Sequence, residues 1–131
     1  MAAVGTLTMV SSEVRAGLYV YTFSWTSDAA GNVSGTTFPL APGTIVSLEF
    51  QPGTGGSQPT NLYNVVLNDD MAVDLLGGSG AGLSNAANSI TTPRINSERV
   101  YHHGGSCELK VSAAGNAKSG VVVVYIAPGI L

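Results

Sequence analysis

Residues 18–25 of this chain, LYVYTFSW, constrain its fold more strongly than any other stretch. Aromatic side chains occupy every second position: Tyr19, Tyr21, Phe23 and Trp25. An extended chain places such residues on one side, whereas a helix would spread them around its circumference, so the period predicts a β-strand. Aromatic residues in strands usually face the core, and an exposed sugar-binding platform is the alternative. Thr26–Asn32 contains Asp, Gly and Asn and should turn the chain, so we expect Val33–Phe38 to return as the partner strand of a hairpin.

Four further segments have the pattern of strands. Three of them alternate apolar and polar residues, as half-buried strands do: Val46–Phe50, Tyr63–Leu67 and Cys107–Ala113. The fourth, Gly120–Ile126, is a continuous β-branched run of the kind buried on both faces. No segment predicts a long amphipathic helix. The predicted fold class is therefore all-β: an antiparallel β-sandwich, jelly-roll-like or Ig-like, of six to eight short strands with long Gly-rich loops.

The strand pattern weakens over residues 69–96, which mix Leu and Ala with glycine and small polar residues. Val73–Leu76 could form a short strand, and Leu83–Ile90 could form a short helical turn or a loop. Connections of this length tend to be functional or mobile. We therefore expect partner contacts here, with Leu83 and Ile90 as candidates.

A chain of 131 residues suits one domain, and no linker divides it. We assign residues 1–16 to an N-terminal arm and residues 17–131 to a single β-sandwich domain. The arm carries apolar side chains that could contact a partner: Val4, Leu7, Met9 and Val10. Two interpretations stay open. The arm adds a strand to a neighbouring subunit, or it is the first strand of its own sandwich.

Charged residues make up only 10% of the chain, against about 25% in typical soluble domains. Such a surface is covered either by small polar residues or by neighbouring subunits. The net charge is −3, and the five Lys and Arg residues are scattered, which argues against nucleic-acid binding. The single cysteine excludes an internal disulfide and fits a reducing cytosol. The N-terminus has no pattern of a signal peptide and the longest apolar run is too short for a membrane span, so we expect a protein made and kept in the cytoplasm, unless a particle carries it out.

The pair His102-His103, followed by Cys107, is the first candidate for a metal site. Adjacent side chains on a strand point to opposite faces, so at most one of these histidines would share a site with Cys107. We favour a histidine pair at a surface or an interface, and both residues are candidate partner contacts.

Two other clusters resemble ligand sites but lack their defining residues. Asp69, Asp70 and Asp74 do not form the loop of a calcium-binding hand and are better explained as turn caps. The glycine-rich residues 77–83 lack the Lys-Ser/Thr of a phosphate-binding loop. Serines are abundant, but none lies in a nucleophile motif. We expect no catalytic residues, no metal and no cofactor.

Several stretches together resemble small virion structural proteins of tailed bacteriophages and prophages: YTFSWTSDAAGNVSG, GTIVSLEFQPGTGGSQPTNLYNVVLND, VDLLGGSGAGLSN and AAGNAKSGVVVVYIA. The resemblance spans roughly residues 18–127 and consists of turns and core strands. It implies a non-enzymatic particle component on the capsid surface, made in the bacterial cytoplasm. Head decoration (cement) proteins, which bind the major capsid protein and are often trimers, are the favoured class. A tail, neck or fibre component and a carbohydrate-binding β-sandwich module are the alternatives.

Overall fold

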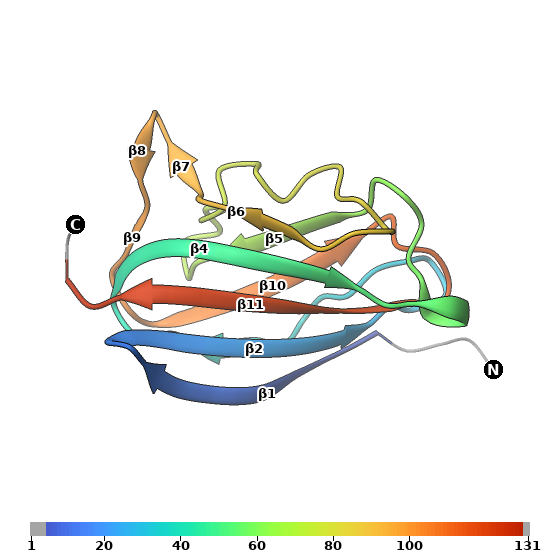
Figure 1. Cartoon of the computed structure of the whole chain (residues 1–131), viewed down its shortest axis with the longest axis horizontal. Coiled ribbons are helices and arrows are strands. Elements are labelled where there is room, and N and C mark those ends of the chain that lie inside the picture. Colours follow the sequence, from blue (N-terminus) through green and yellow to red (C-terminus); the bar gives the residue numbers. More distant parts are fainter. Residues whose placement is uncertain (1–4, 130–131) are drawn as a thin grey trace.

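The computed structural model describes residues 5–129, which form two antiparallel sheets packed face to face (Figure 1). The larger sheet has the order β1-β2-β11-β4-β6, and β9 also pairs with β4. Its strands are β1 (Thr6–Arg15), β2 (Leu18–Thr26), β4 (Gly43–Pro52), β6 (Ser89–Thr91), β9 (Tyr101–His102) and β11 (Ser119–Ala127). The smaller sheet, of order β3-β10-β5, comprises β3 (Thr37–Pro39), β5 (Asn64–Asn68) and β10 (Ser106–Ser112). A hairpin of β7 (Arg94–Ile95) and β8 (Glu98–Arg99) projects from one end of the sandwich.

The predicted all-β antiparallel sandwich is thus confirmed. Among residues 5–129 there are eleven strands, more than the six to eight expected, because five of them contain only two or three residues. Such short strands pair too few residues to leave a period in the sequence. One 3₁₀ turn, η1 (Gly55–Ser57), is the helical element of the described chain.

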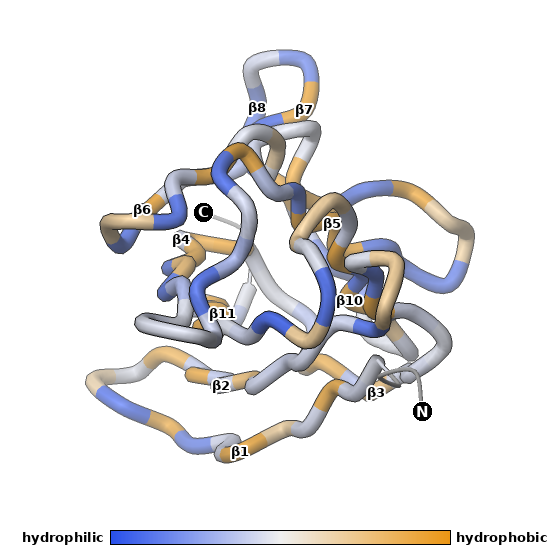
Figure 2. Tube along the Cα trace, turned by 90° about the vertical axis from the view of Figure 1, so that its right-hand side faces the viewer, coloured by the Kyte–Doolittle hydropathy of each residue, from blue (hydrophilic) through white to orange (hydrophobic). Residues whose placement is uncertain are grey.

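The core lies between the two sheets, and the larger sheet curls around it while β10 and β5 close the other side (Figure 2). The predicted aromatic face is confirmed as a core face: Tyr21, Phe23 and Trp25 are buried, and Tyr19 packs against them. Opposite strands contribute Tyr63, Val65 and Leu67 from around β5, and Cys107, Leu109 and Val111 from β10. The indole of Trp25 lies 5.7 Å from the Tyr63 ring, between ring centroids.

Strand β11 lies in the middle of the larger sheet, between β2 and β4. Its core face, Val122, Val124 and Ile126, is buried as predicted. On the opposite face Val123 is buried, whereas Val121 and Tyr125 are only half-buried. The prediction of burial on both faces therefore holds fully only for the core face, because within residues 5–129 no second layer covers the outside of this sheet.

The predicted hairpin of residues 18–38 is wrong. Strand β2 pairs with β1 on one side and with β11 on the other, so no position is left for Val33–Phe38. That segment crosses to the smaller sheet instead. Val33 exchanges backbone hydrogen bonds with Val111 at 2.9 and 3.0 Å, and Phe38 pairs with Cys107 as part of β3.

The assignment of residues 1–16 to a free arm is also corrected. Thr6–Arg15 pairs along its length with β2 as the first strand of the same sandwich, which was the second interpretation left open above. Ala16 and Gly17 form the two-residue turn, with φ of 52° and 80°. Positive φ at both central positions gives the turn whose twist suits a hairpin. Val4, one of the candidate contacts, lies outside the described residues.

Residues 69–96 form mainly turns. The expected strand at Val73–Leu76 is absent, because Asp74 makes only an isolated bridge to Asn68. The side chains of Leu75 and Leu76 are instead buried in the core. Over Leu83–Ile90 there is no helical turn: Leu83 bridges to Tyr63, and the chain then enters β6.

Candidate functional site

Strand β1 forms one edge of the larger sheet, and it extends past the part of the sheet that the core covers. Leu7 is buried and Met9 packs against the core, but every residue from Val10 to Arg15 is exposed. Val10 and Val14 have 61% and 68% of their surface in solvent. A register shift between Met9 and Ser11 makes Val10 the extra residue of a β-bulge. We call β1 with its exposed valines the β1 edge.

The outer side of the β1 edge carries unpaired backbone groups. The hydrogen bonds of this strand go to β2, and its other side has no backbone partner within residues 5–129. The side chains protecting the edge are few: Glu13 and Arg15 form an ion pair with each other near the turn. An open edge of this length is a template for pairing with another chain.

The predicted partner contacts fall into two groups. Leu7, Leu83 and His102 are buried, so they present little surface to a partner. Val10 and Ile90 are exposed, on β1 and β6, which are the two edges of the larger sheet. His103 is exposed as well, with a salt bridge to Asp70. Met9 is partly buried beneath the edge.

The prediction that His102 and His103 point to opposite sides is wrong, because their rings lie side by side with centroids 5.4 Å apart. His103 follows the end of β9, so the alternation of a strand does not apply to it. His102 is fully buried, and its Nε2 lies 3.6 Å from the Cys107 sulfur. Burial lowers the pKa of His102, with His103 adding a smaller repulsion, and burial raises the pKa of the Cys107 thiol to about 12. Both groups are therefore neutral at pH 7. This pair is a packed part of the core, so the prediction of a surface or interface position is wrong for His102, whereas His103 is exposed.

The prediction that the aspartates cap turns is confirmed for two of the three. Asp69 Oδ1 accepts hydrogen bonds from the backbone N–H groups of Met71 and Val73, both at 2.9 Å. Asp74 accepts from three backbone N–H groups, those of Leu67, Leu76 and Gly78. Asp70 differs, because its carboxylate faces His103 across a gap of 3.3 Å.

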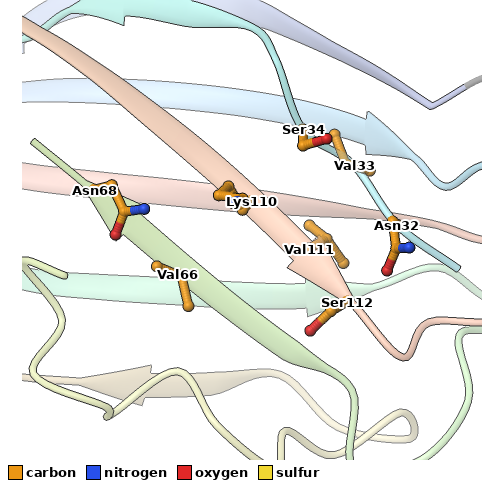
Figure 3. A pocket seen from close by; sticks show the side chains of 8 residues that line it. All are labelled: Asn32, Val33, Ser34, Val66, Asn68, Lys110, Val111 and Ser112. Carbon is orange, nitrogen blue, oxygen red and sulfur yellow. The ribbon is translucent and has the colours of Figure 1, made fainter. Parts of the chain in front are cut away.

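Two shallow grooves lie on the side of the smaller sheet. The first, of about 440 Å³, crosses β10 and β5 (Figure 3). Its lining residues are Asn32, Val33, Ser34, Val66, Asn68, Lys110, Val111 and Ser112. The second, of about 370 Å³, includes Asp69, Asp70 and Glu108. Neither groove is lined by an aromatic residue, so neither offers the stacking surface that sugars favour.

The alternative that the aromatic face of β2 is an exposed sugar-binding platform is wrong. Trp25 is 1% exposed and Phe23 is fully buried, so the face that would bind a glycan is inside the protein. Sequence reasoning named Val10 as a candidate contact but missed that β1 is the edge strand of its own sheet, and it missed the approach of His103 to Asp70. Neither could be found from the sequence, because both depend on which segments meet in space.

Comparison with protein-family models and with curated proteins gave no match. Within residues 5–129 the structure contains no helix that is long and apolar enough to cross a membrane.

Proposed function

We propose that this chain is a non-enzymatic structural subunit that attaches to neighbouring subunits through the β1 edge, and that it serves as a decoration (cement) protein on the capsid of a tailed bacteriophage. The observation that carries the attachment is the β1 edge itself, ten residues long, whose outer side has no backbone partner in the described part of the chain. The resemblance of the sequence to virion structural proteins supplies the particle, the capsid location and the major capsid protein as partner.

Pairing at an open edge needs little side-chain specificity, because the incoming strand is held by backbone hydrogen bonds. The β1 edge adds two exposed valines to this, and full burial of a valine is worth roughly 1.5 kcal/mol. The low content of charged residues, 10%, suits a surface that neighbours cover, because charged residues are depleted in the centres of interfaces.

A cement protein works by mass action. It binds the assembled lattice in many copies and not the separate subunits, so each copy shifts the equilibrium towards the assembled state. A subunit with this task requires no nucleophile or base. The one close thiol–imidazole pair among the described residues, Cys107 and His102, is buried and neutral, which is consistent with a structural role.

One double variant at the edge and one control test the attachment surface. Val10→Lys with Val14→Lys places two charges on the β1 edge, where lysine blocks strand addition. Both positions are exposed, so the free energy of unfolding should change by no more than about 0.5 kcal/mol per site. Leu62→Lys is the matched control, because Leu62 is 61% exposed, like Val10, but lies outside β1. Sedimentation velocity and binding to purified particles should show loss of association for the edge variant and none for the control.

The particle itself tests the larger proposal. Quantitative mass spectrometry and cryo-electron microscopy of the virions should find this chain in hundreds of copies at lattice positions of the head. A few copies at the neck or tail would move the assignment to a tail component, and absence from the particle would reject the virion function. If the chain is in the head but Val10→Lys/Val14→Lys binds as well as the original protein, the β1 edge is not the attachment surface.

A further inference from the structure

The side chains of Asp69, Asp70 and His103 meet although they come from segments more than thirty positions apart in the sequence. Asp69 and Asp70 directly follow β5, and His103 directly follows β9. One ligand atom from each of the three lies within 4.8 Å of the other two. We propose that these three residues bind a divalent transition-metal cation, with Zn²⁺ as the reference ion.

The closest pair already has the spacing of two ligands on one ion. His103 Nε2 and Asp70 Oδ1 are 3.3 Å apart, and two ligands at about 2.1 Å from a tetrahedral zinc ion are separated by about 3.4 Å. The Asp69 oxygen must come closer to these two atoms, because the three ligand atoms are only known to lie within 4.8 Å of one another. Both side chains of the pair are about half exposed, so rotation about their side-chain bonds brings the three atoms together without disturbing the core.

Asp69 is the most firmly positioned of the three ligands. Both of its backbone hydrogen bonds, from Met71 and Val73, go to Oδ1, which leaves Oδ2 for a cation. The hydrogen bond from Val73 is the main reason that the pKa of Asp69 lies below its usual value. The two backbone hydrogen bonds therefore hold the carboxylate in place before a metal arrives.

The loop after His103 is built for a close approach to Asp70. Gly104 and Gly105 have φ of 94° and 97°, values that other residues rarely adopt. A side chain at Gly105 would begin 3.3 Å from Asp70 Oδ2. The second groove, of about 370 Å³, has Asp69 and Asp70 in its lining. It supplies space for the water molecules that complete the coordination of an ion with three protein ligands.

The ligand set selects the class of ion. An imidazole nitrogen suits Zn²⁺, Cu²⁺, Ni²⁺ and Fe²⁺, whereas Mn²⁺, Mg²⁺ and Ca²⁺ favour oxygen ligands. Two carboxylates also neutralise the charge of a divalent ion. A bound metal would join the end of β5 to the β9–β10 loop and stabilise the folded chain in proportion to the logarithm of its concentration over Kd.

Isothermal titration of the full chain without an affinity tag, at pH 7.5, tests the proposal with ZnCl₂, MnCl₂ and CaCl₂. We expect one Zn²⁺ per chain, weaker Mn²⁺ binding and the weakest binding for Ca²⁺. Asp70→Asn and His103→Gln should each raise the Kd for Zn²⁺ at least tenfold. Asp28→Asn is the control for loss of a carboxylate outside the cluster: Asp28 accepts backbone hydrogen bonds from Ala30 and Asn32 in another turn, in the same pattern as Asp69.

Cys107→Ala provides the second control, because a thiol beside His102 is another zinc-binding group. Retention of Zn²⁺ affinity in this variant supports the proposed ligands. Loss of binding in Cys107→Ala with normal binding in His103→Gln would overturn the proposal and place the metal at the thiol. No heat of binding at 1 mM Zn²⁺, or equal Kd values for all variants, would show that Asp70 and His103 form an ion pair only. Circular dichroism of each variant verifies that the comparison is between folded proteins.

Discussion

Gly120→Ala is the substitution whose cost the structure defines most closely. Gly120 lies in β11 directly opposite Trp25 in β2. A methyl group on Gly120 would lie 2.6 Å from Trp25 Cζ2 and 2.8 Å from Nε1, whereas carbon atoms in contact are normally about 3.5–4.0 Å apart. The indole cannot retreat, because it is buried against Tyr63.

Overpacking of this kind costs about 1–3 kcal/mol. For a domain of this size, about 4 °C of Tm per kcal/mol translates that cost into a fall of roughly 4–12 °C. Thermal and urea unfolding followed by circular dichroism measure it. Gly56→Ala is the control, because a methyl group there has no atom within 4 Å, and it should change the free energy of unfolding by less than about 0.5 kcal/mol.

A double-mutant cycle separates this clash from other reasons for a glycine. Trp25→Leu removes all three ring atoms nearest to Gly120, together with a buried Nε1 that has no partner among the described residues. It should cost roughly 2–4 kcal/mol alone. In its background Gly120→Ala should cost at least about 1 kcal/mol less than in the original chain. An equal cost in both backgrounds would refute the steric argument.

Four further outcomes are expected. Cys107 should react with a thiol reagent only after unfolding, as followed by absorbance, because it is 1% exposed; rapid reaction of the native protein would contradict its burial. Burial raises the pKa of the native Cys107 thiol to about 12, so the thiol of the unfolded chain loses its proton at a lower pH. The free energy of unfolding should therefore fall as pH rises above about 9. In Cys107→Ala, the urea midpoint should depend less on pH between pH 8 and 10. Asp74→Ala should lower the free energy of unfolding by about 1–3 kcal/mol in urea titrations, because three backbone N–H groups lose their acceptor. Ala16→Asn should raise the Tm, by an amount corresponding to about 0.5–1 kcal/mol, because asparagine tolerates the positive φ at this turn.

The alternation of side chains predicts which face of a strand is buried, and this succeeded. Tyr21, Phe23 and Trp25 face the core because the sheet has one covered side. Alternating residues of a strand lie on the same face, so a period of two indicates which residues face the core. The period says nothing about which strand lies next to it. The sequence therefore predicts Val33–Phe38 as the partner of β2, whereas the partner is β1. The hairpin turn that joins β1 to β2 is Ala16-Gly17, which lacks the asparagine or aspartate that usually marks such a turn.

The candidate sites were less predictable, because they depend on contacts between loops. The sequence presented Asp70 and His103 as members of two separate clusters, and only the fold brings them to 3.3 Å. His102 was expected at a surface, yet the core closes over it beside Cys107. Leu75 and Leu76 lie among turn residues with no period, and the carboxylate of Asp74 replaces the sheet hydrogen bonds that a strand would have supplied there.

The position of β11 has a consequence for how the chain folds during synthesis. The ribosome makes β2 and β4 long before β11, yet β11 lies between them in the sheet. Until it emerges, β2 and β4 each have an open side, and the pair Trp25 and Gly120 must close a loop of roughly a hundred residues. Long-range pairing of this kind makes folding slow, and the unpaired strand edges are prone to aggregation until β11 has been synthesised and has paired. The nascent protein should therefore depend on chaperones more than its modest size suggests.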